Sequence, residues 1–347
     1  MTKSPWKAVR AAITPPAPDE TFSSILERAA AFWDMDRSEL IGSWMLNDIC
    51  AGDAAEADTP TPELRAALAH TIGVDEGALT PTTIEHGDWV VAGGHRIAYC
   101  PLCWEEDAAQ GRDPYFRRAW CSLATVQCEQ HVVPLRPWLK DARGGRCGPP
   151  ARQGKHLSQE RLAQCVQHAR LWRDAPGNQL LRDVLSEVSA FSSQAIAVLK
   201  GDEFPARWRG DAQTLKDLVV LLTTNPAPFA ERIPLDRLVP VVPDETLFGS
   251  RRRAAAPGTT QEGWDAIRQL GSPQVRRTLW WLVGRTIVPQ WKPLPIRGSP
   301  GLCHDPEGWW GRRIESSVSA HSRLEARRIG SRLGFGVHEQ IGDLFVA

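Results

Sequence analysis

The sequence predicts a mainly α-helical protein with a helical, helix-turn-helix-like N-terminal domain, a small zinc-finger module and a helical C-terminal domain. Apolar residues recur at helical spacing along most of the chain, while strand patterns are few. A loop-rich segment with closely spaced Cys and His residues separates the helical parts, and 347 residues are too many for one ordinary core. We therefore expect an N-terminal domain over residues 1–95, a zinc-finger module over 96–150, a helical domain over 151–250 and a basic, Trp- and Arg-rich region over 251–347.

Three helices are expected in the N-terminal domain. The first lies in PDETFSSILERAAAFW, where Asp19 can serve as the N-cap and apolar side chains from Phe22 to Trp33 share one face. The second lies in DRSELIGSWML. The third, TPELRAALAHTIG, can be capped by Thr61 and ended by Gly73.

The stretch LAHTIGVDEGALTPTTI has the pattern of a helix-turn-helix: a helix, a turn with Gly and a short second helix. Such a unit can place a helix in a DNA groove. However, the second helix carries no Lys or Arg, and contacts to phosphate need positive charge. The unit is therefore either a DNA reader or a helical packing and protein-docking domain.

Helical patterns return after the Cys/His segment. The clearest apolar stripes are NQLLRDVLSEVSAFSSQAIAVL and DAQTLKDLVVLLTTN, and QERLAQCVQHARLW also reads as a helix. Further on, WDAIRQLGSPQVRRTLWWLVGRTI predicts two helices broken at Gly271–Pro273, with Trp280 and Trp281 in the core. The best strand candidate is a short hairpin in GDWVVAGGHRIAYC.

The strongest chemical signal is a pair of metal-binding knuckles. Cys100 and Cys103 form a CxxC, and Cys128 and His131 form a CxxH 24 residues further on. Four such ligands complete the tetrahedral shell that Zn²⁺ prefers and leave no open position for water or substrate. We therefore expect one structural zinc ion rather than a catalytic one.

Other interpretations of the cysteines are weaker. A redox-active CxxC would leave the second knuckle unexplained, and a deaminase would need a Glu where His86-Gly87-Asp88 has Asp. Cys121 is expected to pack inside. Cys165 and His168 repeat the CxxH spacing with Cys147 upstream, but the segment looks helical and Cys147 has no CxxC partner, so a buried Cys and a surface His are favoured. Whether a second zinc site exists there stays open.

The cysteine cluster and its surroundings resemble the TniQ family of transposition proteins, which includes the target-selection protein TnsD. The resemblance rests on CPLCWEED, on YFRRAW from Tyr115 to Trp120, on CEQH and on VVPLRPW. The opening DETFSSILERAA is similar to the family's start through Asp19, Glu20, Ser24, Arg28 and Ala30. The resemblance covers about residues 15–140. Many relatives carry a second cysteine set soon after the His, whereas this chain keeps only Cys147.

This resemblance implies a non-catalytic adaptor in DNA transposition. Such adaptors join a target-recognising component, which is a CRISPR effector complex or the target DNA itself, to an AAA+ ATPase of the TnsC or TniB kind that recruits the transposase. Some family members work as dimers, so a homodimer is among the implied states. The sequence has no P-loop and no Ser elbow, so ATP hydrolysis is expected to be a partner's task.

Charge is divided between the two halves of the chain. Residues 1–150 carry 14 Lys and Arg against 21 Asp and Glu, and the remainder carries 27 against 20. We expect the acidic half to dock a protein and the basic half to contact DNA. The candidate nucleic-acid residues are arginines beside tryptophans or in a run: Arg251, Arg252, Arg253, Arg276, Arg277, Arg312 and Arg313.

The sequence also allows two alternative functions to be weighed and predicts the cellular compartment. The runner-up function is a sequence-specific DNA-binding regulator that uses the helix-turn-helix and the finger. A zinc-dependent hydrolase or nuclease is disfavoured by the closed ligand set. No apolar run is long enough for a membrane span and the start lacks a secretion signal, so we expect a cytoplasmic protein with reduced thiols and no membrane partner.

Overall fold

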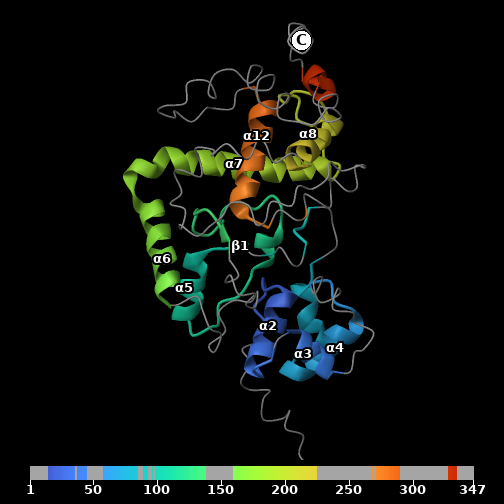
Figure 1. Cartoon of the computed structure of the whole chain (residues 1–347), viewed down its shortest axis with the longest axis vertical. Coiled ribbons are helices and arrows are strands. Elements are labelled where there is room, and N and C mark those ends of the chain that lie inside the picture. The colour runs from blue at the N-terminus through green and yellow to red at the C-terminus, as the bar shows by residue number, and fades with distance from the viewer. Residues whose placement is uncertain are drawn as a thin grey trace, which may run out of the picture. The chain divides into compact units, whose positions relative to one another are not determined.

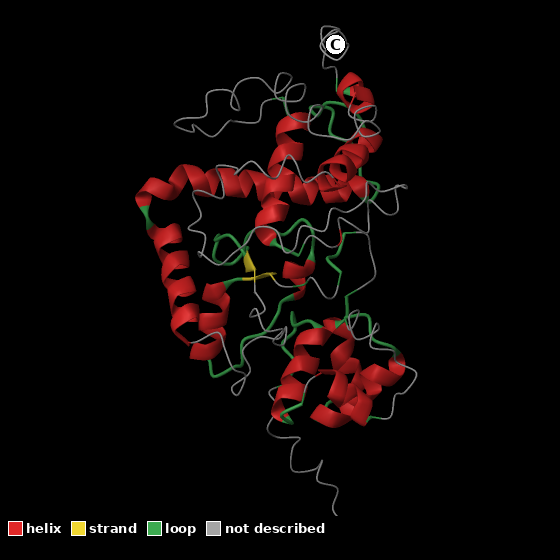
Figure 2. Cartoon of the chain, in the orientation of Figure 1, coloured by secondary structure: helices red, strands yellow, loops and turns green. Residues whose placement is uncertain are grey.

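The computed structural model describes residues 15–35, 37–44, 58–84, 89–92, 96, 98–137, 159–224, 268, 271–289 and 327–333. These residues are mainly helical, as predicted, with one short β-pair (Figures 1 and 2). They fall into two compact units, one up to Asn178 together with Gln269–Pro273 and one with the remaining residues from Gln179 onward. The four-part division expected from the sequence stays a prediction.

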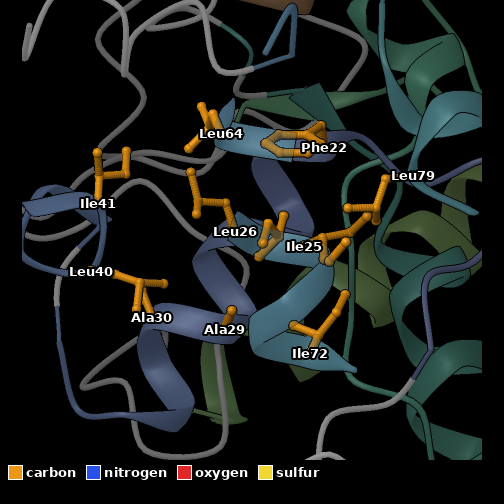
Figure 3. Packing of buried hydrophobic residues seen from close by; sticks show 12 residues of the cluster. Phe22, Ile25, Leu26, Ala29, Ala30, Leu40, Ile41, Leu64, Ile72 and Leu79 are labelled. Atoms are coloured by element: carbon orange, nitrogen blue, oxygen red, sulfur yellow. The ribbon is translucent and has the colours of Figure 1, made fainter. Parts of the chain in front are cut away.

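The N-terminal helices pack around one apolar core. They are α2 (Phe22–Phe32), α3 (Arg37–Ser43), α4 (Pro62–Ile72) and the 3₁₀ helix η2 (Glu76–Thr82). Figure 3 shows side chains from all four elements turned toward one another. The core consists of twelve buried apolar residues: Phe22, Ile25, Leu26, Ala29, Ala30, Leu40, Ile41, Leu64, Leu68, Ala69, Ile72 and Leu79.

The ends of these helices follow ordinary capping chemistry. The Thr61 side chain accepts a hydrogen bond from the Leu64 amide, and Gly73 ends α4 in the left-handed conformation at φ 75°. The cap expected from Asp19 is wrong. Thr21, directly before the first helical residue, caps α2 instead by accepting from the Ser24 amide, and the Asp19 carboxylate accepts a hydrogen bond from Tyr115 at 2.8 Å.

The helix-turn-helix pattern is present in outline, with a difference in its second element. The helix and the Gly73 turn lie where they were predicted, but η2 is a 3₁₀ helix with Pro81 inside it. Because proline lacks an amide donor, it cannot continue an α-helical ladder. Whether this unit reads DNA stays a prediction.

The metal module, residues 98–137, consists of short elements. Strands β1 (Ala98–Tyr99) and β2 (Arg136–Pro137) pair in antiparallel fashion, and α5 (Pro101–Ala109) and the 3₁₀ helix η4 (Arg118–Cys121) lie between them. Trp104 stacks on Tyr99 at 4.1 Å between ring centroids and donates its indole proton to the Tyr115 carbonyl. The local hairpin expected in residues 87–100 is wrong for the described strand, because β1 pairs with residues beyond the second knuckle.

Helix α6 (Gln159–Asp174) lies against α5, and the short 3₁₀ helix η5 (Pro176–Asn178) follows it (Figure 1). Four of its side chains are buried: Cys165, Val166, Ala169 and Trp172. The Arg170 guanidinium also donates to Glu105 on α5 at 2.7 Å. Helix α6 therefore belongs to the same unit as the metal module.

The second unit contains α7 (Gln179–Leu199), α8 (Ala212–Thr224), α12 (Pro273–Ile287) and a helical turn within 327–333. Helix α12 begins directly after the predicted break, and Trp280 and Trp281 are buried as expected. The Phe191 ring contacts Trp208 and Trp280. None of the described helices combines the length and hydropathy needed to cross a bilayer.

Candidate metal centre

The four predicted ligands come together through two local structures. Cys100 is the N-cap of α5 and Cys103 lies in its first turn, so both sulfurs face the positive end of the helix dipole. Cys128 and His131 flank a tight turn in which the Val132 amide donates to the Cys128 carbonyl. Strand β1 directly precedes the first knuckle and β2 follows shortly after the second, so their pairing brings the two knuckles together.

The distances between ligand atoms fit a tetrahedral ion. His131 Nδ1 lies 3.6 Å from Cys100 Sγ, 3.4 Å from Cys103 Sγ and 3.6 Å from Cys128 Sγ. Cys103 Sγ and Cys128 Sγ are 3.5 Å apart. Ligands at about 2.0–2.3 Å from a tetrahedral zinc ion lie roughly 3.5–3.8 Å from one another. The side chains present therefore fit a Cys₃His metal site, and all four residues are buried.

The protonation of the thiols also fits a metal site. Burial raises the pKa of Cys100, and hydrogen bonding with Cys100 and Cys128 raises that of Cys103. The same contacts lower the pKa of Cys128, whose sulfur accepts them. Metal binding requires the thiols to lose their protons, and a cation bound at the centre would replace them.

Around the ligands, the family-like motifs of the sequence meet each other. The Tyr115 hydroxyl donates to Asp19 at 2.8 Å, and the Phe116 amide donates to the Ser24 hydroxyl at 3.1 Å. Burial and the bond to Asp19 outweigh the nearby Arg117 and raise the pKa of Tyr115, so the phenol stays protonated and donates. We call this contact between the start of α2 and residues 115–117 the motif interface.

Two buried ion pairs support the motif interface from either side. Arg117 donates to both oxygens of Asp107, at 3.0 and 3.1 Å, and its guanidinium lies 4.3 Å from the centre of the Tyr115 ring. Arg28 donates to both oxygens of Glu20, at 2.9 and 2.8 Å. Buried charges are stable only when they are paired in this way. Arg28 and Arg117 therefore have a structural role as partners of buried carboxylates.

Sequence analysis missed three polar residues of this region. Asp107 is fully buried, and Asp58, also buried, pairs with Arg96 and accepts from the Ser23 amide and hydroxyl. Glu106 accepts from His131. Two of them, Glu106 and Asp107, lie in the acidic run after CPLC. Their contacts were not predicted, because partners that are far apart in the chain leave no periodic pattern in the sequence.

The other predicted site residues have different outcomes. Arg276 and Arg277 are each only 1 % exposed on α12, a position from which a guanidinium does not reach a phosphate. Their role in nucleic-acid binding stays a prediction, and the burial of both side chains does not favour it. Arg251, Arg252, Arg253, Arg312 and Arg313 lie outside the described residues, as does Cys147.

Within the described ranges, the Cys₃His group is the one cluster of three or more ligating side chains close enough to hold an ion. Cys121 and Cys165 are buried, as expected for core residues. A second metal site around Cys147, Cys165 and His168 stays open.

Comparison with known proteins gives one match. Residues 12–135 match the model of the family described as TniQ, while no curated protein and no solved structure matches the chain. The matched range contains the N-terminal helices, the motif interface and all four candidate ligands. The chain thus contains a TniQ domain over residues 12–135, which indicates a transposition-associated protein.

Proposed function

We propose that this protein is a non-catalytic adaptor in DNA transposition. It links a target-recognition component, a CRISPR effector complex or the target DNA, to an AAA+ ATPase regulator and through it to the transposase. The match of residues 12–135 to the TniQ family carries this proposal. The acidic N-terminal half is the side that we assign to protein docking, and the basic C-terminal half is the side that we assign to DNA or a nucleoprotein complex.

We also propose that the metal is a single Zn²⁺ with a structural role. Three thiolates and an imidazole suit Zn²⁺ better than a hard cation, and four protein ligands leave no position for a reactive water. Metal analysis of the purified chain is expected to give one zinc per protein. A metal that carries exchangeable water, or a zinc content that Cys103→Ser leaves unchanged, would contradict this assignment.

The adaptor role is tested by co-purification with candidate AAA+ ATPases of the TnsC or TniB kind from the same genome. The full-length chain should retain the ATPase after nuclease treatment, because the proposed contact is between proteins. Reconstituted transposition should then need this chain in addition to the ATPase and transposase. Transposition that proceeds equally well without it would overturn the proposal.

A DNA-binding measurement distinguishes the adaptor from the competing function, a sequence-specific DNA-binding regulator. At about 0.15 M salt, a regulator binds its site far more tightly than random DNA. We expect no such preference for transposon-end DNA from the chain alone. Strong preference together with failure to retain the ATPase would favour the regulator.

A further inference from the structure

Two neighbouring carboxylates on α5 have different partners. Glu106 accepts from His131 Nε2 at 2.9 Å and from Gln130 Nε2 at 2.7 Å. Glu105 instead pairs with Arg170 of α6 at 2.7 Å. Glu106 thus contacts the candidate metal ligand His131, whereas its neighbour Glu105 contacts helix α6.

We propose that Glu106 is a positioning residue of the metal centre. By accepting the Nε2 proton of His131, it selects the tautomer in which Nδ1 carries the free electron pair, and Nδ1 is the atom that faces the three sulfurs. This proposal rests on the metal assignment made above and goes beyond it, because Glu106 is not a ligand.

The geometry supports this role from both ends of the imidazole. A neutral imidazole has one N–H donor and one acceptor, so the partner of one nitrogen decides the chemistry of the other. Nδ1 lies within 3.6 Å of each sulfur, whereas Nε2 lies against a carboxylate that can only accept when it is ionised. A carboxylate in this position also makes the imidazole a stronger electron donor to a metal.

The second oxygen of Glu106 is held as well. Gln130, the residue before His131, donates its side-chain amide to that oxygen, so the carboxylate is fixed by two residues of the same knuckle. The Glu106 side chain is 45 % exposed whereas that of His131 is 7 % exposed. Removing Glu106 therefore leaves the buried ligands and the core in place and changes the orientation of the imidazole.

The test compares zinc affinity in the full chain, measured by competition with a chromophoric chelator. Glu106→Ala should weaken zinc binding about 10- to 100-fold, the usual effect of losing a carboxylate behind a histidine ligand. Glu105→Ala is the matched control and should leave zinc affinity unchanged. Glu106→Gln keeps an acceptor oxygen and should lose less affinity than Glu106→Ala.

A spectroscopic measurement separates positioning from a general loss of stability. In the zinc-loaded chain labelled with ¹⁵N-histidine, the Nε2 proton of His131 should resonate downfield and exchange slowly with water. In Glu106→Ala it should move upfield and exchange faster, while circular dichroism stays unchanged.

The outcomes distinguish this proposal from the zinc assignment. Wild-type protein that binds no zinc would overturn the assignment, and the proposal with it. Wild-type protein that binds zinc no more tightly than Glu106→Ala, or an Nε2 signal that Glu106→Ala leaves unmoved, would overturn the role of Glu106 alone.

Discussion

The N-terminal helices and the metal module adjoin each other in one unit and are stabilised in different ways. The helices α2, α3, α4 and η2 share a core of twelve apolar residues, none more than 5 % exposed. In the metal module the strands are two residues long and α5 has nine residues. Its specific contacts are the four candidate ligands and buried charge pairs such as Asp107 with Arg117.

This difference follows from the lengths of the elements. A nine-residue helix and a two-residue strand pair are marginal by themselves in water, because few hydrogen bonds compensate the loss of chain entropy. A tetrahedral ion held by both knuckles cross-links residues far apart in the chain and adds binding energy to folding. The metal module therefore depends on these polar contacts as well as on buried apolar side chains such as Trp104 and Leu135, and each side of the comparison can be broken separately.

The largest effect is expected from Cys128→Ser, which removes a metal ligand. Metal binding by zinc-finger peptides contributes about 10–16 kcal/mol to folding, so the module should lose most of its stability. Hydrogen exchange should show that the amides of residues 98–137 lose protection while those of α2 and α4 keep more of theirs. Metal analysis should give less than one ion per chain.

The matched control for this change is Cys121→Ser, since Cys121 is buried outside the ligand set. It should keep its metal and its protection over 98–137. Equal metal loss in both variants would mean that the four ligands are wrongly assigned.

Asp107→Asn is the next largest change. Arg117 and Arg112 both donate to this fully buried carboxylate, and removing its charge leaves the largely buried Arg117 with only the half-exposed Asp19 as a charged partner. Breaking a buried pair in this way costs about 3–5 kcal/mol. Chemical denaturation would measure the loss, and Asp34→Asn, at an exposed position, should have little effect. If the two variants were equally stable, buried charge would not be what supports the module.

Leu26→Ala tests the apolar side of the comparison. Leu26 is fully buried in the helical core, and its truncation should lower the free energy of unfolding by about 2–5 kcal/mol. Zinc affinity should stay unchanged, because the ligands lie outside that core. Zinc loss as large as in Cys128→Ser would show that the two regions fold as one cooperative unit.

The same comparison explains what could be predicted from sequence. Apolar periodicity, Thr61 and Gly73 predicted the helices, because each depends on residues close in the chain. The ligands were predicted because CxxC and CxxH each report a local knuckle. The partner of β1 was missed, since it lies about 40 residues away along the chain. The cap at Thr21 is a local contact with Ser24, and it was missed because Asp19 and Thr21 are both of residue types that favour the N-cap position.

The smallest predicted effect concerns the motif interface, where the two regions meet. Tyr115→Phe removes the hydroxyl that donates to Asp19, a carboxylate that is half exposed, so the loss should be about 0.5–1.5 kcal/mol. Asp19 also pairs with Arg117 at 3.2 Å, so Asp19→Ala should cost more than Tyr115→Phe. A double-mutant cycle of the two changes isolates the hydroxyl's share. A coupling energy near zero would mean that Asp19 acts through Arg117 alone, and that the tyrosine of YFRRAW stabilises the interface only through its ring.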